Sequence, residues 1–394
     1  MIYKNITPYR NENSASYPSV PSNTLRFMFS KTDYDPTVAG VGSFGTWAKK
    51  TEFPNANVWD WTNTNTDWQG SFKGAFPDAD NEVRVIAAGD TSSVTNINKI
   101  FAGVFANTPI QTSYSVTARN NLVSCIPFDT TSCTDYSYAF CCSALKDVVK
   151  FRYNNSLISI NCNYIFADTL VEHVDDLDFY GTNVSISGAF ARADLIRKAS
   201  VKGVENVTSA NAVFWSNVSN SLEEVEIQGV FNTCQYFNTM FQNSRKLKYP
   251  PKLKSNAVSV NCQGIYIQCF EAEKVDLEVN KANRVDYLFN NCYALKELPL
   301  IDTSTSTHFE SMMSNCRNVE TIPDYDVSSA TTVQNMCRFM YKAKYGILEM
   351  YNKLLARGSA ITNHVDCFKD CGRDTEEGQI ALSQIPASWG GTGT

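Results

Sequence analysis

The sequence predicts an α/β solenoid, a stack of repeated coils built from short strands and short helical turns. A similar pattern of apolar residues recurs about every 24 residues over most of the chain, which is typical of repeat proteins. The 394 residues are 43% hydrophobic and only 19% charged, so the chain can bury a large core and is not intrinsically disordered. No run approaches the roughly 18 apolar residues of a membrane-spanning helix. We therefore expect a globular repeat protein without a membrane span.

The N-terminal part differs in composition from the rest. Residues 1–24 contain three prolines, and we expect them to form an extended arm. Residues 25–124 form a tryptophan-rich region that we interpret as an attachment or capping region. Four of the six tryptophans of the chain lie there, namely Trp47, Trp59, Trp61 and Trp68. Flat rings bury a large area at low entropic cost, so these side chains either cover the first repeat or form an interface with a protein or glycan.

The repeats are clearest around Phe289 and Met313, and we call the residue at this position the anchor of its repeat. Each of these two anchors has apolar residues four and one positions before it, a cysteine three positions after it (Cys292 and Cys316), and apolar residues six and nine positions after it. We place the solenoid over 125–343, with a partial copy at Cys337 and a candidate earlier copy at Phe101. The anchors that precede Phe289 are Phe140, Phe166, Phe190, Phe214, Phe241 and Tyr266.

The spacing within a repeat suggests its local structure. Apolar residues four and one positions before the anchor fall on one face of a short helical turn. The segment Asp-Thr-Ser at 302–304 precedes one such turn, and its side-chain oxygens can cap free backbone N–H groups. The apolar residues after the anchor belong to a short extended piece that Pro terminates. One unit cannot bury its own apolar face, so neighbouring units must stack.

The runs 237–247, 285–295 and 301–323 resemble leucine-rich repeats of the BspA type, whose class has periods of 20–29 residues. The resemblance covers roughly residues 125–375. It implies a leucine-rich-repeat solenoid that serves adhesion or protein binding. Such proteins usually carry a secretion signal. The start of this chain has no apolar signal segment, and we expect a protein made in a reducing cytoplasm.

The C-terminal part, residues 344–394, is expected to contain a helix, the last repeat and a cap. Apolar residues with i, i+4 and i+7 spacing predict an amphipathic helix over 344–357. Gly358 suits the position just after its end. We expect this helix to close the solenoid, because the last coil of a repeat stack needs a cover.

The cysteines follow the repeat rather than a disulfide pattern. The chain has 13 of them, an odd number. Four lie three residues after an anchor, in what reads as a ladder at one repeat position: Cys269, Cys292, Cys316 and Cys371. Free cysteine is among the most buried residue types, so we expect buried thiols at this position. This interpretation agrees with assembly in a reducing environment.

Composition and motifs give little support to catalysis or nucleic-acid binding. The net charge is −6, there are only three histidines, and paired C-x₂-C spacing and phosphate-binding loops are missing from the sequence. We therefore expect no catalytic residue, cofactor, metal or nucleic-acid partner. Asp175, Asp176 and Asp178 could serve a glycosidase or a calcium site, although a solvated loop is the plainer interpretation. A basic cluster, 245–254, is either a solvated face or a contact to an acidic partner.

The N-terminal region joined to these repeats resembles virion proteins of crAss-like and other phages that infect gut Bacteroidetes. This resemblance implies a non-enzymatic structural protein, namely a head fibre, a tail fibre or a capsid decoration, assembled in the host cytoplasm. Its partners would be other virion proteins, further copies of itself in a fibre, and a host surface protein or glycan. Two alternatives stay open: a bacterial cell-surface adhesin of the BspA type, and a glycan-degrading enzyme on a solenoid.

Overall fold

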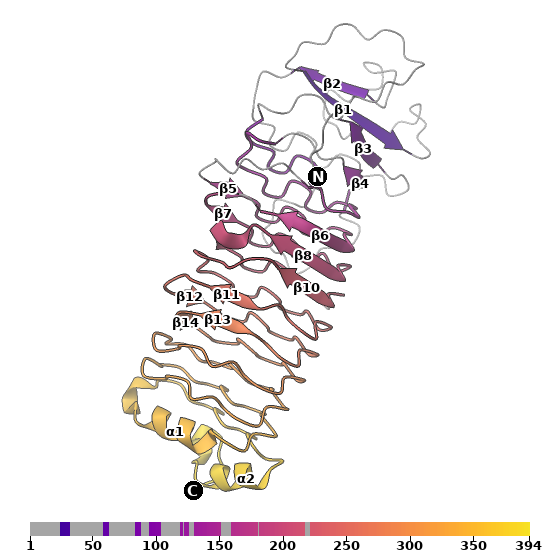
Figure 1. Ribbon diagram of the computed structural model, residues 1–394. Coiled ribbons are helices and arrows are strands. Elements are labelled where there is room, and N and C mark those ends of the chain that lie inside the picture. The colour runs from indigo at the N-terminus through magenta and orange to yellow at the C-terminus, as the bar shows by residue number, and fades with distance from the viewer. Residues whose placement is uncertain are drawn as a thin grey trace. The chain divides into compact units, whose positions relative to one another are not determined.

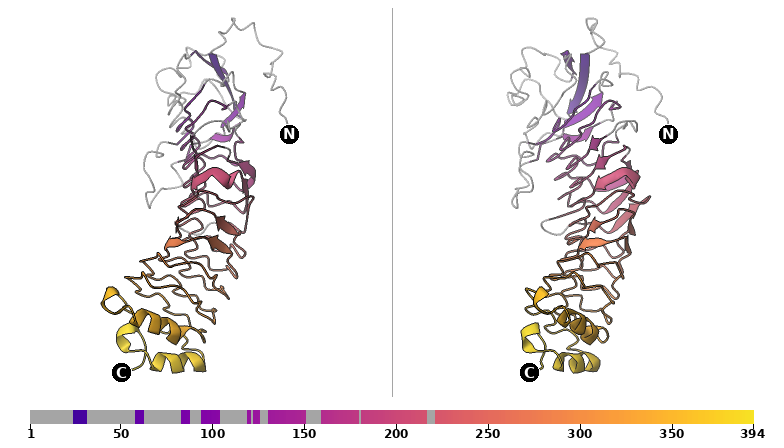
Figure 2. Two further views of the ribbon diagram at one scale, coloured as in Figure 1. Left: turned by 60° about the vertical axis from the view of Figure 1, so that its left-hand side comes forward. Right: turned by 90° about the vertical axis from the view of Figure 1, so that its left-hand side faces the viewer.

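A computed structural model gives the fold (Figures 1 and 2). It describes residues 94–103, 119–120, 122–125, 130–150, 159–179, 181–216 and 221–394, and the backbone of three earlier strands. The chain divides into two compact units, Met1–Val171 and Glu172–Thr394. Apart from the backbone of Thr24, the predicted arm over 1–24 lies outside the described residues. So do Trp47, Trp68 and most side chains of the tryptophan-rich region over 25–124. Within the described part of the chain, every helix is too short to cross a membrane.

The first unit contains a four-stranded sheet with the order β2-β1-β3-β4. Its strands are β1 (Thr24–Lys31), β2 (Val58–Thr62), β3 (Val83–Ala87) and β4 (Leu122–Cys125). β1 runs antiparallel to β2 and β3, and the backbone of Trp59 and Trp61 in β2 pairs with that of Phe27 and Leu25. β3 and β4 pair in parallel. The change from antiparallel to parallel pairing occurs where the repeats begin.

The repeats form coils that stack through parallel pairing, so the predicted solenoid of short parallel strands is confirmed. In the second unit one row of strands comprises β6 (His173–Asp178), β8 (Lys198–Lys202) and β10 (Glu224–Ile227), and a separate parallel pair comprises β11 (Leu253–Ser255) and β13 (Leu277–Val279). A second row comprises β7 (Val184–Ser185), β9 (Val207–Ser209), β12 (Val260–Asn261) and β14 (Ala282–Arg284). The first unit contributes β5 (Ile160–Asn161), which forms a parallel bridge to Asp135. Successive coils lie side by side (Figure 1).

The anchors form the core of both units. All of them are buried, and their aromatic rings stack from coil to coil. In the first unit the ring centroids of Phe101, Phe140 and Phe166 are 5.7 Å apart at each step. In the second unit a longer stack has steps of 5.5–5.9 Å and runs through Phe190, Phe214, Phe241, Tyr266 and Phe289. Phe101 therefore begins a coil of its own, and its backbone N–H donates to Ala139 in the next one.

The expected short helical turns are wrong in the described repeats. Around Phe289, the residues two before and two after the anchor, Tyr287 and Asn291, have left-handed backbones with φ of 60° and 62°. The N–H of Leu288 bonds to Val285 within the turn, whereas that of Phe289 bonds to Met312 of the next coil at 2.7 Å. Amides that alternate between the turn and the neighbouring coil cannot form a helix. Apolar spacings of three residues fit both structures, which explains the wrong prediction.

The Asp-Thr-Ser segment at 302–304 and the Asp-Val-Ser segment at 326–328 cap the chain locally, although no helix follows them. A side-chain oxygen of Asp302 accepts the N–H of Ser304 at 2.9 Å, and Asp326 accepts that of Ser328 at 2.8 Å. Hydrogen bonds from the side chain and then the backbone of the serine, Ser304 or Ser328, lower the pKa of each carboxyl. The hydroxyl of Thr303 bonds to the carbonyl of Asp326 in the next coil at 2.8 Å. The motif therefore fixes both the turn and the register between coils.

The buried cysteine ladder ties each coil to the one before it. Cys292 lies three residues after its anchor, and its thiol donates to the carbonyl of Tyr266, the preceding anchor, at 3.1 Å. Cys316 bonds in the same way to Phe289 at 3.3 Å. All cysteines of the described residues have free thiols. Burial raises the pKa of Cys292 to about 12, so this thiol stays protonated and can donate its hydrogen.

Two α-helices lie at the C-terminal end of the second unit (Figure 1). The predicted helix is present as α1 (Ile347–Leu355), and α2 (Glu376–Ser383) follows it. Short 3₁₀ helices occupy Val204–Asn206, Gly358–Ala360 and Ala387–Trp389. Gly346 precedes α1 with a left-handed φ of 83°. A larger residue would not fit at this position, because a Cβ would lie 2.3 Å from the carbonyl oxygen of Ile322. The ring of Tyr351 meets those of Phe368 and Trp389 edge-on.

Candidate functional site

The surface next to the first row of strands carries a ladder of paired charges. Seven residues after successive anchors, lysine and glutamate alternate, and we call this column the charge ladder: Lys248, Glu273, Lys296, Glu320 and Lys344. Glu273 lies 2.8 Å from Lys248 and 2.6 Å from Lys296. The two lysines lower the pKa of Glu273 to about 2 by hydrogen bonding to its carboxylate. The charges on this side of the solenoid thus serve mainly to join neighbouring coils.

A second ladder lies where the turn ends, four residues after the anchors. We call it the aromatic–arginine ladder, and its members are Arg245, Phe270, Tyr293, Arg317 and Tyr341; Arg373, five residues after Phe368, continues it in the last coil. The rings of Phe270 and Tyr293 stack with their centroids 4.7 Å apart. The guanidinium of Arg317 lies 4.3 Å from the ring of Tyr293 and 5.7 Å from that of Tyr341. Such contacts between cations and aromatic faces are favourable and hold the guanidinium flat.

Both ends of the aromatic–arginine ladder are guanidinium groups. The central carbon of Arg245 lies 4.8 Å from the ring of Phe270, and that of Arg373 lies 3.8 Å from the ring of Tyr341. Rings and guanidinium groups therefore continue through successive coils. All three rings are half-buried, so each one still offers part of its surface to solvent.

Two of the three arginines of this ladder, Arg245 and Arg317, differ from the lysines in their partners, whereas Arg373 pairs with Asp374 at 3.2 Å. Within the described residues, Arg245 and Arg317 have no carboxylate within ion-pair distance. Arg317 donates to the side-chain oxygen of Asn315 at 3.3 Å, and Arg245 donates to Gln268 at 3.5 Å. A guanidinium has five N–H donors, so most of its capacity stays available to a ligand. The arrangement can therefore bind an anion through its guanidinium groups, while neighbouring members of the ladder cover the faces of the rings.

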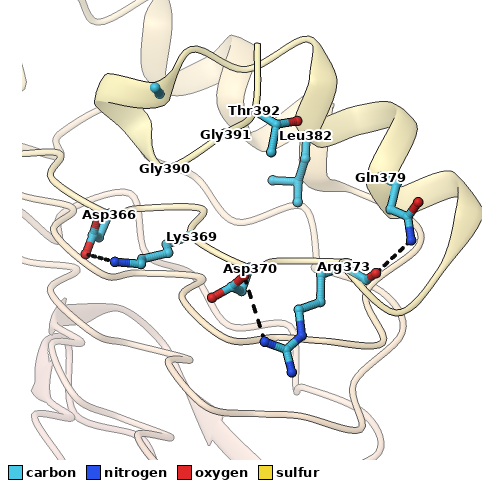
Figure 3. Close-up of a pocket in the computed structure, with 10 residues that line it drawn as sticks. Asp366, Lys369, Asp370, Arg373, Gln379, Leu382, Gly390, Gly391 and Thr392 are labelled. Carbon is cyan, nitrogen blue, oxygen red and sulfur yellow. Dashed lines mark hydrogen bonds and ion pairs between the residues drawn. The ribbon is translucent and has the colours of Figure 1, made fainter.

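A pocket of about 540 Å³ lies beside the last member of this ladder (Figure 3). Its residues come from the last coil, α2 and the C-terminal segment. Arg373 faces Asp370 at 3.9 Å, and Lys369 lies 3.3 Å from Asp366. Gln379 of α2 donates to the backbone carbonyl of Arg373 at 2.8 Å. The charged groups that line this pocket are thus engaged with one another, and we assign no ligand to it.

The carboxylates of β6 are held by neighbouring coils. Asp176 accepts a hydrogen bond from the hydroxyl of Ser200 at 3.0 Å, and Asp178 lies 3.9 Å from the ammonium of Lys202. The basic cluster over 245–254 separates into two parts. Lys252 and Lys254 pair with Glu278 of the next coil, whereas Arg245 belongs to the aromatic–arginine ladder. Within the described residues Arg245 has no carboxylate partner, so it remains available to a ligand.

The residues singled out in the sequence are mostly structural in position. The anchors, Cys292 and Cys316 are buried, so their side chains belong to the core and not to the aromatic–arginine ladder. The aromatic–arginine ladder was not predicted from the sequence. One signal would have revealed it: when the repeats are aligned on their anchors, the column four residues on contains Arg, Phe, Tyr, Arg and Tyr from Arg245 to Tyr341.

Comparisons of the chain with protein-family models, with curated proteins and with solved structures gave no match. The assignment of a function therefore depends on the geometry of the second unit and on the sequence resemblance.

Proposed function

We propose that this chain is a non-enzymatic recognition protein, a leucine-rich-repeat solenoid that presents its aromatic–arginine ladder to a ligand. The observation that carries the proposal is the contrast between the two ladders. The lysines pair with glutamates of neighbouring coils, whereas Arg245 and Arg317 lie on aromatic rings without a carboxylate partner in the described residues. The capacity for binding an anion is therefore concentrated on one edge of the solenoid.

The ligand that best fits this edge is an acidic polysaccharide. A guanidinium binds a carboxylate through two parallel hydrogen bonds, and the tyrosine hydroxyls of the ladder can exchange hydrogen bonds with sugar hydroxyls. The ladder offers both groups in a row, one residue per coil, from Arg245 to Arg373. A row of similar sites at regular intervals suits a polymer that itself repeats. A folded protein partner would rather need a broad patch with an apolar centre.

We further propose that the chain is a structural protein of a phage particle, as a head fibre, tail fibre or decoration. The support is the resemblance of 285–295 and 301–323 to BspA-type repeats and of the N-terminal region to virion proteins. In this proposal residues 25–124 attach the protein to other virion proteins or to further copies of the chain, and the C-terminal helices cap the solenoid. Assembly would take place in the host cytoplasm.

Binding to an acidic polysaccharide tests the first proposal. The full chain is titrated with a polyuronate and with a neutral glucan of similar length. We expect binding of the polyuronate only, and Arg317→Ala should weaken it at least about tenfold, the effect of one lost charge-assisted contact. Lys296→Ala is the matched control, because it removes one positive charge from the charge ladder; it should change affinity less than about twofold.

Equal losses in Arg317→Ala and Lys296→Ala would show that binding depends on charge alone and would overturn the assignment of the site. Absence of polyuronate binding, or binding of a host protein that tolerates Arg317→Ala, would overturn the choice of ligand. Mass spectrometry of purified phage particles tests the second proposal, and absence of the chain from particles would contradict it.

A further inference from the structure

Two adjacent thiols and a carboxylate meet in the first unit. Cys141 and Cys142 directly follow the anchor Phe140, and Asp168 lies two residues after the anchor Phe166. Cys142 and Asp168 hold the same position in successive coils, and the N–H of Cys142 donates to the carbonyl of Ala167 at 2.9 Å. The stacking of the two coils therefore brings these side chains together.

The distances within this cluster are short. The Sγ atoms of Cys141 and Cys142 are 3.5 Å apart, and Sγ of Cys142 lies 3.9 Å from Oδ2 of Asp168. The three ligand atoms all lie within 4.8 Å of one another. Both cysteines are buried and Asp168 is half-buried. The cluster is therefore closed to solvent on the side of the core, and an ion can enter it from the side of Asp168.

Cys142 is an unusual residue for its backbone position. Its φ of 57° is left-handed, a conformation in which Asn and Asp are several-fold enriched. Asn243, Asn291 and Asn315 hold the equivalent position in later coils. The thiol also differs in role from those of the cysteine ladder, which donate to backbone carbonyls in the core. Phe339 holds the equivalent position in another coil, so coil pairing imposes this backbone on other residues too and does not by itself explain a cysteine that faces a carboxylate.

We propose that Cys141, Cys142 and Asp168 bind one thiophilic divalent cation, Zn²⁺ or Cd²⁺, with a fourth coordination position open to water. In a tetrahedral zinc site with bonds of about 2.3 Å to sulfur and 2.1 Å to oxygen, two sulfurs lie about 3.8 Å apart and sulfur and oxygen about 3.6 Å apart. The distances of 3.5 and 3.9 Å differ from these by only a few tenths of an ångström.

Binding would deprotonate the two thiols and release their protons to solvent, because only the thiolate is a metal ligand. It would also join two successive coils, since the thiolates come from the coil of Phe140 and the carboxylate from that of Phe166. The cation should therefore stabilise the first unit. This inference is independent of the proposed polysaccharide binding, which concerns the second unit.

Metal titration of the reduced full chain tests the site. The protein is stripped with a chelator and titrated with Co²⁺ as a spectroscopic probe, and Zn²⁺ is then added in competition. We expect about one equivalent of Co²⁺ with a thiolate-to-metal charge-transfer band, loss of that band on adding Zn²⁺, and a higher melting temperature with Zn²⁺. Cys292→Ser, which alters a buried thiol of the cysteine ladder, is the matched control and should bind like the wild type.

Cys142→Ser should lose the charge-transfer band, and Asp168→Asn should weaken Co²⁺ binding at least about tenfold. The Asp168→Asn variant should also fold normally, since this residue is half-buried and Asn suits its left-handed backbone. No Co²⁺ binding at micromolar concentration, or equal binding by wild type and Asp168→Asn, would overturn the proposal.

Discussion

The charge ladder and the aromatic–arginine ladder run along the same coils of the second unit, but their cationic side chains have different partners. Glu273 lies between Lys248 and Lys296, so cations and anions neutralise each other across coils. Arg317 lies between Tyr293 and Tyr341, whose rings orient it without neutralising it. The comparison teaches that the charges of one ladder join neighbouring coils, while Arg245 and Arg317 of the other have no carboxylate partner in the described residues.

The largest expected effect comes from the core beneath both ladders. Phe289→Ala removes a fully buried ring that stacks on Tyr266, and it should lower the free energy of unfolding by about 3–5 kcal/mol. Denaturant unfolding of the full chain measures this loss. If the loss were below 1 kcal/mol, the ladders would not depend on the shared core, and the comparison between them would lose its basis.

A smaller effect is expected at the cysteine ladder, just beneath the aromatic–arginine ladder. Cys292→Leu should cost about 1–3 kcal/mol, because the larger side chain overfills a buried site. Cys292→Ser should cost only about 1 kcal/mol, since a hydroxyl can still donate to Tyr266 and other coils have Ser143 and Ser244 at this position. The two melting curves would contradict this order if serine were the worse substitution.

At the aromatic–arginine ladder itself the effect on stability should be smaller still. Arg317→Ala removes contacts with two half-exposed rings and should cost about 0.5–1 kcal/mol. Arg317→Lys keeps the charge but not the planar group, and it should recover less than half of this loss. Unfolding experiments on both variants test this, and full recovery by lysine would mean that the planar group is irrelevant.

The charge ladder should contribute least at neutral pH, but its contribution should depend on pH. The pKa of Glu273 falls to about 2 in the folded chain, against about 4.3 in an unfolded one. The folded-state pKa is lowered, so the stabilisation is complete above about pH 4.3 and is lost as the pH falls towards 2. Glu273→Gln should flatten the melting temperature over this range, and 1 M salt should do the same.

Glu297→Gln is the matched control for that experiment, because Glu297 has a single lysine partner, Lys274, instead of two. It should leave most of the acid dependence in place. A pH profile that is identical in Glu273→Gln and in the wild type would show that the charge ladder contributes nothing to the stack.

Much of this fold could be predicted because its core columns are periodic. The anchors from Phe140 to Met313 and the cysteines after them are all buried, as a repeating apolar pattern requires. The turns could not be predicted, because left-handed positions such as Tyr287 and Phe339 carry residues that do not favour this backbone and are forced into it by the pairing of coils. The aromatic–arginine ladder could not be predicted pair by pair, because its contacts join residues about 24 positions apart.

The alternation of turn amides has a consequence for the length of the stack. Every second amide of a turn donates a hydrogen bond to a carbonyl of the following coil. An uncovered last coil would therefore expose a row of N–H groups without acceptors, to which another chain could bind. Here the N–H of Phe368 bonds to the carbonyl of Trp389 at 2.9 Å, and that of Gly372 folds back to Met340. The C-terminal segment thus accepts an amide that the last coil would otherwise expose, and we expect truncation before it to make the protein self-associate end to end.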